Sequence, residues 1–263
     1  MIQQLLNDNV ENKTIHDKYV HFSSIKQGYK IPNIVHMTFC STNVPLPMYN
    51  VIKQNKQKSS NCKFKFYDDD MCDALIKTHF IPEIYNAYLS INPVYGAMRA
   101  DFFRYCVLYL IGGIYVDIKS SINYSLFKII GKEDTCILDL PRNHAEPWRR
   151  NNPTYEQWLL IFAPNHPYLH NMINLMVQYI NNKYIPKLLN VLKPSTKQQI
   201  LNITGPDAFT KAVNSEIIIQ QKQLHRIINY DKYFEIIGCP NYKKMYTINN
   251  KKHYSEMNLP LYK

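Results

Sequence analysis

The stretch from residue 97 to residue 118 constrains the fold of this chain more than any other part of it. Four apolar residues recur at helical spacing in its first half: Ala97, Phe103, Val107 and Leu110. They predict a helix over 97–110, which Gly112-Gly113 then ends. The mostly apolar run from 114 to 118 has β-branched members and predicts a buried, central strand. A helix that passes through two glycines into such a strand is typical of a layered α/β protein.

Helices and strands alternate in the rest of the chain as well. The sequence predicts further strands at 34–39, 64–67, 136–140, 158–163, 226–229 and 234–237. It predicts further helices at 45–60, 70–77, 82–90, 170–180 and 206–214, the second of them capped by Asp70. No internal repeat or low-complexity linker interrupts this order. We therefore expect one domain over residues 31–263, preceded by a polar arm over residues 1–30.

Charge and cysteine content exclude some functions. The 31 basic and 20 acidic side chains give a net charge of +11, which favours anionic partners without choosing among them. A nucleic-acid-binding module is one alternative, but no run of five or more basic residues occurs and no nucleic-acid partner is expected. No two of the six cysteines form a CxxC motif, so a structural zinc site is not expected. Free thiols in a reducing compartment are the simpler interpretation.

The location of the protein follows from its apolar segments. The N-terminal sequence MIQQLLNDNVENK lacks the basic and apolar regions of a signal peptide. The most apolar stretch, Tyr105 to Ile118, is too short to span a bilayer. We therefore expect a soluble protein without a transmembrane segment, either cytoplasmic or recruited to a membrane by a partner.

Three charged side chains flank the two glycines. Asp101 and Arg104 are spaced i, i+3, so both emerge on one face of the predicted helix. Arg99 points elsewhere unless the helix begins there. Asp117 lies at the carboxyl end of the predicted strand, where open α/β sheets bind ligands. It can hold a divalent metal or accept hydrogen bonds from sugar hydroxyl groups. A solvated ion pair and a strand-end cap are the structural alternatives.

The stretch Arg99 to Lys119 resembles the signature of the DxD-containing GT-A glycosyltransferases of family 32. In that pattern an Asp-x-x-Arg helix precedes Gly-Gly-Ile-Tyr and an Asp-x-Asp strand. Weaker similarities lie at 31–39, 66–70, 163–167 and 204–206, whereas the last fifty residues match poorly. The resemblance implies a GT-A fold, a Rossmann-like mixed sheet flanked by helices in a single domain. Residues 31–135 would form the nucleotide-sugar half and residues 136–263 the acceptor half.

The resemblance also implies a function. It predicts a retaining transferase that moves a hexose or N-acetylhexosamine from a UDP- or GDP-sugar to a glycan, lipid or protein acceptor. Asp101 and Arg104 would hold hydroxyl groups of the donor sugar, and Asp117 would contact the ribose or sugar and a metal. These three are the predicted catalytic residues. The predicted donor-binding residues are Thr38, Tyr67, Arg99, Asp101, Arg104, Tyr115, Asp117 and Lys119.

The chain departs from the family pattern at one position, because it reads Asp117-Ile118-Lys119 instead of Asp-x-Asp. A protonated lysine cannot ligate a metal. In one arrangement Lys119 points away, and Asp117 with a late residue such as His253 holds Mn²⁺ or Mg²⁺. In another, the Lys119 ammonium itself neutralises part of the leaving diphosphate. A third interpretation is a weakened or inactive protein that binds nucleotide sugars or glycans.

Acceptor contacts are predicted after the strand at 136–140. The loop there is polar and aromatic, and Glu146, Trp148 and Arg149 could bind a sugar ring or an anionic acceptor. Asn165 and His166 follow the next predicted strand and could line the same cleft. An ordinary surface loop is the structural alternative for both segments.

Overall fold

The computed structural model describes residues 12–14, 29–143, 152–187, 194–246 and 254–263. Its main sheet has the strand order β4-β2-β5-β8-β7-β9. These strands are β4 (Lys63–Tyr67), β2 (Ile34–Thr38), β5 (Gly113–Val116), β8 (Leu159–Phe162), β7 (Cys136–Asp139) and β9 (Arg226–Ile228). β2 pairs in parallel with β4 and β5, and β7 pairs in parallel with β9, whereas β8 runs antiparallel to β5 and β7. The predicted mixed α/β sheet with a central strand after the two glycines is confirmed.

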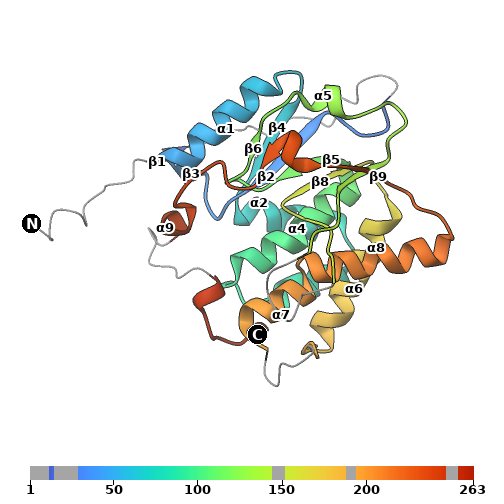
Figure 1. Cartoon of the computed structure of the whole chain (residues 1–263). Helices are drawn as coiled ribbons and strands as arrows, with labels where there is room; N and C mark the ends of the chain where they lie inside the picture. Colours follow the sequence, from blue (N-terminus) through green and yellow to red (C-terminus); the bar gives the residue numbers. More distant parts are fainter. Residues whose placement is uncertain (1–11, 15–28, 144–151, 188–193, 247–253) are drawn as a thin grey trace, which may run out of the picture.

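Side chains alternate between the two faces of this sheet, and each face is covered by its own helices. On one face Tyr115 and Leu160 pack under α4 (Gly96–Ile111), α6 (Pro167–Asn181) and α8 (Pro206–Gln220). On the other, Ile114 and Leu159 pack beneath α1 (Leu46–Lys58). Figure 1 shows these two helical layers, with α1 on the side of the sheet opposite α4, α6 and α8. Both faces of the strands are therefore buried, as in other sheets with crossover helices.

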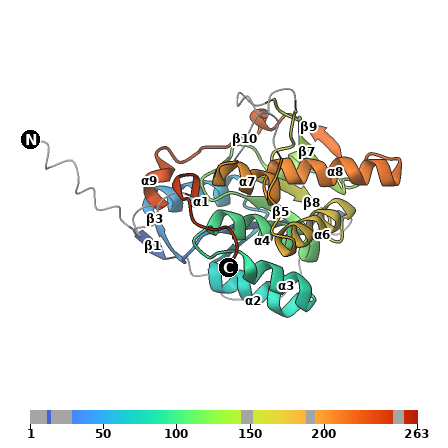
Figure 2. The same ribbon diagram turned by 90° about the horizontal axis from the view of Figure 1, so that it is seen from below.

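Two further helices lie on the outer side of the layer formed by α4, α6 and α8. They are α2 (Asp69–His79) and α3 (Pro82–Ser90), which pack against α4 and α6 and lie at the lower edge of Figure 2. The cap predicted for α2 was wrong. Asp68 is in the extended conformation and its side chain accepts a hydrogen bond from the Met71 backbone N–H, whereas Asp70 lies within the first turn.

The turn at Gly112-Gly113 requires glycine at both positions. Their φ angles are 70° and 101°, a region that side chains rarely adopt. A Cβ on Gly112 would lie 2.6 Å from Pro164 Cδ, and one on Gly113 would lie 2.5 Å from the Ile34 carbonyl oxygen. His36 Nε2 lies 2.9 Å from the Gly112 carbonyl oxygen. This turn therefore packs the end of α4 directly against the neighbouring strand β2.

The second half of the chain differs from its prediction in detail. α6 begins at Pro167 rather than at 170, with His166 as its cap, and α8 continues to Gln220 rather than 214. Helix α7 (Thr196–Ile203) was not predicted, although Ser195 and Gln198 form a capping box at its start. The strand predicted at 234–237 is shorter, as β10 (Phe234–Glu235), and pairs with β6 (Ser121–Ile122).

Smaller elements complete the described structure. β1 (Asn12–Thr14) pairs with β3 (Asn43–Pro45). The remaining helical segments are α5 (Leu126–Ile129), η1 (Tyr230–Lys232), α9 (Tyr242–Tyr246) and η3 (Tyr254–Glu256). All six cysteines carry free thiols. Within the described residues, every helix is too short or too polar to cross a lipid bilayer.

Candidate functional site

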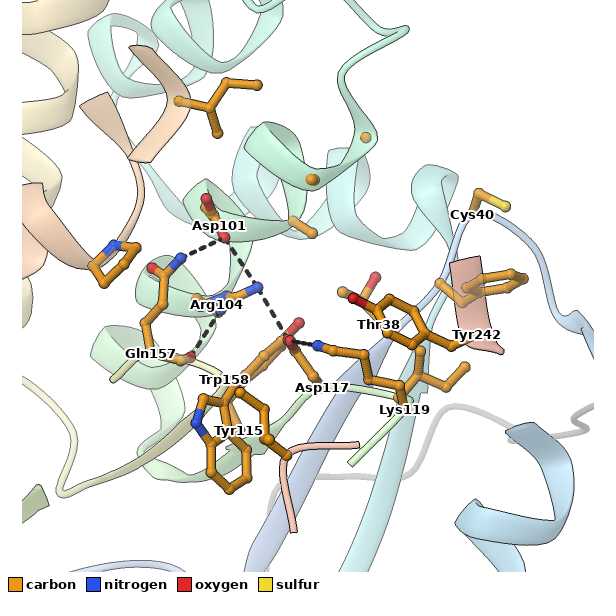
Figure 3. A pocket seen from close by; sticks show the side chains of 18 of the residues that line it. Thr38, Cys40, Asp101, Arg104, Tyr115, Asp117, Lys119, Gln157, Trp158 and Tyr242 are labelled. Atoms are coloured by element: carbon orange, nitrogen blue, oxygen red, sulfur yellow. Dashed lines mark hydrogen bonds and ion pairs between the residues drawn. The ribbon is translucent and has the colours of Figure 1, made fainter. Parts of the chain in front are cut away.

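A pocket of about 380 Å³ lies at the carboxyl ends of β2 and β5. These two strands are parallel neighbours, so the residues that follow them meet at one edge of the sheet. Thr38 comes from the end of β2, and Asp117 and Lys119 follow β5. α4 contributes Asp101 and Arg104 to the opposite wall, and Figure 3 shows the side chains of both walls pointing toward one another.

Arg104 joins the helix to the strand. Its Nη2 lies 3.0 Å from Asp101 Oδ1 and 3.2 Å from Asp117 Oδ1. The side chains are 6 % exposed for Arg104, 7 % for Asp101 and 19 % for Asp117, so these are not solvated surface pairs. Its Cζ also lies 4.6 Å from the centre of the Tyr115 ring. One guanidinium therefore holds both carboxylates in a fixed arrangement.

Two residues far along the chain complete the hydrogen bonds of Asp101. Gln157 Nε2 donates to Asp101 Oδ1 over 3.1 Å, and the Thr204 hydroxyl donates to Asp101 Oδ2 over 2.9 Å. The Gln157 backbone oxygen accepts a further hydrogen bond from Arg104 Nη1 at 2.8 Å. Gln157 reaches the site because β8 runs antiparallel to β5, so its start lies beside the end of β5.

Lys119 points toward the site. Its Nζ lies 2.5 Å from Asp117 Oδ2, so the arrangement in which this lysine points away is wrong. On another side, Nζ lies 5.5 Å from the centre of the Tyr242 ring, which also lines the pocket. The Asp117 carboxylate thus has Arg104 at one oxygen and Lys119 at the other.

The two carboxyl groups differ in their protonation. Burial raises the pKa of Asp101 to about 6, although Arg104 and the Thr204 hydroxyl act against this rise. Burial also raises the pKa of Asp117, but the Lys119 and Arg104 cations outweigh it, so the net shift is downward. At neutral pH both groups are carboxylates. Together with Arg104 they present acceptors and donors that match the paired hydroxyl groups of a sugar.

Six of the residues predicted to bind a donor line this pocket: Thr38, Asp101, Arg104, Tyr115, Asp117 and Lys119. The structure therefore brings together residues from three separate segments of the chain. The roles assigned to these residues remain predictions.

Four predicted residues lie away from the pocket lining. Tyr67 is buried and its hydroxyl group lies 3.0 Å from His36 Nδ1. Arg99 points to the other side of α4, where its Cζ lies 4.3 Å from the Tyr88 ring centre. A spacing of two residues on a helix turns a side chain well away from Asp101. Asn165 and His166 form the turn before α6, which places them at the start of that helix. Residues Glu146, Trp148, Arg149 and His253 lie outside the described residues.

The described residues do not fit a divalent cation. In residues 12–14, 29–143, 152–187, 194–246 and 254–263, no three His, Cys, Asp or Glu side chains come together to hold a metal ion. Asp117 already has a cation at each carboxylate oxygen. A metal ion there would face two positive charges at close range, which disfavours its binding.

Sequence reasoning missed Gln157, Thr204 and Tyr242 as site residues. The turn Thr204-Gly205-Pro206 was noted, but nothing local indicated that its hydroxyl group would reach Asp101. Gln157 is an ordinary polar residue before a strand, and Tyr242 is one of 21 tyrosines. Their positions depend on strand pairing and on the path of the C-terminal segment.

The chain is similar in sequence to known proteins. Residues 6–136 match the model of a family described as "Glycosyltransferase sugar-binding region containing DXD motif". The chain is 25 % identical over 190 residues to Inositol phosphoceramide mannosyltransferase 3 of Schizosaccharomyces pombe, covering 72 % of this chain and 49 % of that protein. It is 26 % identical over 226 residues to the Initiation-specific alpha-1,6-mannosyltransferase of Candida albicans, covering 79 % and 55 %. The chain thus spans about half the length of these two relatives.

A solved structure supports the fold. PaToxG Glycosyltransferase superposes with a TM-score of 0.51 at 16 % sequence identity, over 72 % of this chain and 70 % of that one. At this identity the likeness concerns the fold alone, and it confirms the predicted GT-A architecture.

Proposed function

Because this chain belongs to the glycosyltransferase family whose sugar-binding region contains the DXD motif, we propose that it transfers a sugar from a nucleotide-sugar donor to an acceptor hydroxyl group. The observation that carries the proposal is the contact of Arg104 with both Asp101 and Asp117 in the wall of the pocket. Paired carboxylates around one guanidinium offer the multidentate hydrogen bonds that a hexose needs.

In this proposal each residue has a defined task. Asp101 accepts hydrogen bonds from hydroxyl groups of the donor sugar, and Arg104 donates to them. Asp117 holds the ribose or the sugar from the strand side. The acceptor oxygen forms a bond to the anomeric carbon as the bond to the diphosphate breaks, and the departing phosphate takes the acceptor proton. Attack on the face that the diphosphate leaves retains the anomeric configuration. The protein contributes positioning and charge stabilisation.

The names of the relatives narrow the donor and the acceptor. Both relatives described above are named as mannosyltransferases, which favours a hexosyl donor, with mannose as the first sugar to test. One of them is named for inositol phosphoceramide, so lipids belong beside glycans and proteins among the acceptors to test. The nucleotide is a UDP or a GDP carrier.

A divalent metal is the cofactor that the DXD pattern implies. The predicted ligands for Mn²⁺ or Mg²⁺ were Asp117 and His253, and His253 lies outside the described residues. Because the described residues do not fit a metal ion, none of the steps above depends on one.

The test is a screen of UDP- and GDP-sugars for release of the nucleoside diphosphate, with and without Mn²⁺ and with and without candidate acceptors. We expect release from at least one donor, and Asp117→Asn should lower it by about 100-fold or more. Asp231→Asn is the matched control, because Asp231 also pairs with an arginine but is 69 % exposed and does not line the pocket.

The outcomes separate the possible functions. Full turnover by Asp117→Asn would show that the proposed site is not used. Binding of a nucleotide sugar without any release, in all conditions, would instead identify a non-catalytic binding protein. A product with the anomeric configuration opposite to that of the donor would contradict the retaining mechanism.

A further inference from the structure

Lys119 stands where the DXD pattern has its second aspartate, and its side chain points into the site. Nζ contacts Asp117 Oδ2, and only 15 % of the lysine side chain is exposed. Arg104 Nη2 contacts the other oxygen of the same carboxylate. An ion of charge +2 at Asp117 would have to displace one of these cations or remain beside both. The site already contains the positive charge that a metal would provide.

The backbone at Lys119 is held firmly by the C-terminal part of the chain. The backbone N–H groups of Gly238 and Cys239 donate to the Lys119 carbonyl oxygen over 2.8 and 3.1 Å. The Ser120 hydroxyl donates to the Ile236 carbonyl oxygen over 2.8 Å. A Cβ on Gly238 would lie 1.8 Å from Ser121 Oγ, so the two segments approach as closely as glycine permits. The ammonium is therefore preorganised, which is what charge stabilisation requires.

The ammonium also has donors left for an anion. It carries three N–H groups, of which one donates to Asp117, the hydrogen bond that this ammonium makes among the described residues. Figure 3 shows Lys119 on the Thr38 and Tyr242 side of Asp117, with Asp101 on the opposite side. The end of β2 near Thr38 is where an α/β sheet receives a nucleotide, and Asp101 is the proposed sugar contact. A diphosphate that links the two would pass Lys119.

We propose that the Lys119 ammonium takes the place of the divalent cation of the DXD pattern and binds the donor diphosphate directly, so that donor binding needs no metal. This inference rests on the proposed function, because it names the group that binds the diphosphate of that donor. Arg104 holds Asp117, Asp117 holds the ammonium, and the Tyr242 ring lies on another side of it.

The test measures the binding of UDP and GDP to the whole chain by calorimetry, in EDTA and then in Mn²⁺. We expect the preferred nucleotide to bind in EDTA with an affinity within about 2-fold of that in Mn²⁺, which is less than 0.5 kcal/mol by the relation RT ln 2 ≈ 0.4 kcal/mol. A loss of about 10-fold or more in EDTA would overturn the inference while leaving the proposed function intact. Failure of both nucleotides to bind in either buffer would overturn both.

Variants of Lys119 test whether its ammonium group binds the diphosphate. Lys119→Gln should weaken binding in EDTA by about 10-fold, as expected for a lost charge-assisted hydrogen bond. Lys119→Arg should retain EDTA-insensitive binding, and Lys119→Asp, which restores the DXD spacing, should bind only with Mn²⁺. Lys53→Gln removes the same charge from an exposed position on α1 and is the matched control. Equal affinities for Lys119→Gln and Lys53→Gln, with both proteins folded by thermal unfolding, would overturn the inference.

Discussion

Two buried polar clusters of this molecule contrast in charge and in surroundings. The site cluster, formed by Asp101, Arg104, Asp117 and Lys119, is charged and lines the pocket. The histidine cluster, formed by Tyr155, His166, Tyr168 and His225, lies between β8, α6 and β9 and does not line it.

The histidine cluster is neutral at physiological pH. Burial lowers the pKa of His166 and of His225 to about 4 each. Its hydrogen bonds are satisfied internally, since Tyr168 Oη lies 3.0 Å from His225 Nδ1 and accepts from the Leu224 N–H over 2.9 Å. Buried polar groups are stable when they are neutral and paired, whereas buried charges are costly. The charged cluster lies at the pocket, where the proposed function uses its charges, whereas the cluster away from the pocket is neutral.

The largest effect is expected on removing the cation that the site cluster shares. Arg104→Met would leave Asp101 and Asp117 buried without this partner, so the free energy of unfolding should fall by about 3–5 kcal/mol. Nucleoside diphosphate release should be lost with it. In the control Lys30→Met, the lost pair with Glu133 is 52 % and 85 % exposed on its two sides, so the free energy of unfolding should change far less. Urea unfolding measures the free energy of unfolding of both variants. Equal losses would show that the site cluster depends no more on its cation than an exposed ion pair does.

The next effect concerns the pH dependence of the site cluster. The pKa of Asp101 is raised to about 6, so the carboxylate that we propose to bind the sugar is lost as the pH falls through this value. The kcat/KM of donor hydrolysis should therefore decline below about pH 6. Gln157→Leu removes a hydrogen bond that lowers the pKa of Asp101, and should move this decline to higher pH. An unchanged profile in the variant would show that a different group titrates.

The histidine cluster should make the stability of the protein, rather than its activity, depend on pH. For His166 the folded pKa of about 4 lies below the ordinary value of 6.5, so the unfolded chain takes up its proton first as the pH falls. Stability is fully present above pH 6.5 and is lost as the pH falls toward 4. His166→Asn keeps a helix cap but does not titrate, so its Tm should fall less between pH 7 and pH 5 than that of the wild type. An equal fall in Tm for His166→Asn and the wild type would contradict this role of His166.

The smallest effect is expected at Arg99, which shares α4 with the site cluster but lies on another face. Its Nη2 is 3.9 Å from Asp73 Oδ1, and its Cζ lies over the Tyr88 ring. Arg99→Met should change kcat/KM for the donor by less than about 3-fold. A loss as large as that of Arg104→Met would place Arg99 at the donor, as the sequence alone had suggested.

Much of the site could be predicted because its central residues are close in sequence. Asp101 and Arg104 share a helical face by their spacing, and Asp117 follows an apolar strand that any α/β sheet would bury. Gln157 and Thr204 could not be predicted, because they reach Asp101 across 56 and 103 residues of chain. Lys119 was visible as a departure from the family pattern, but its direction was open until Nζ was seen against Asp117.

The fold, like the site, could be predicted only in part. Periodicity along the chain was enough to find the helices and strands around Gly112-Gly113, because it reflects which side chains one element buries. The order and direction of the strands were not readable in this way, since they depend on contacts between distant segments and on how the whole core is buried. The antiparallel pairing of β8 with β5 is such a contact, and it brings Gln157 to the pocket. Local spacing therefore specifies the charged residues of the site, whereas long-range pairing sets the neighbours that orient them.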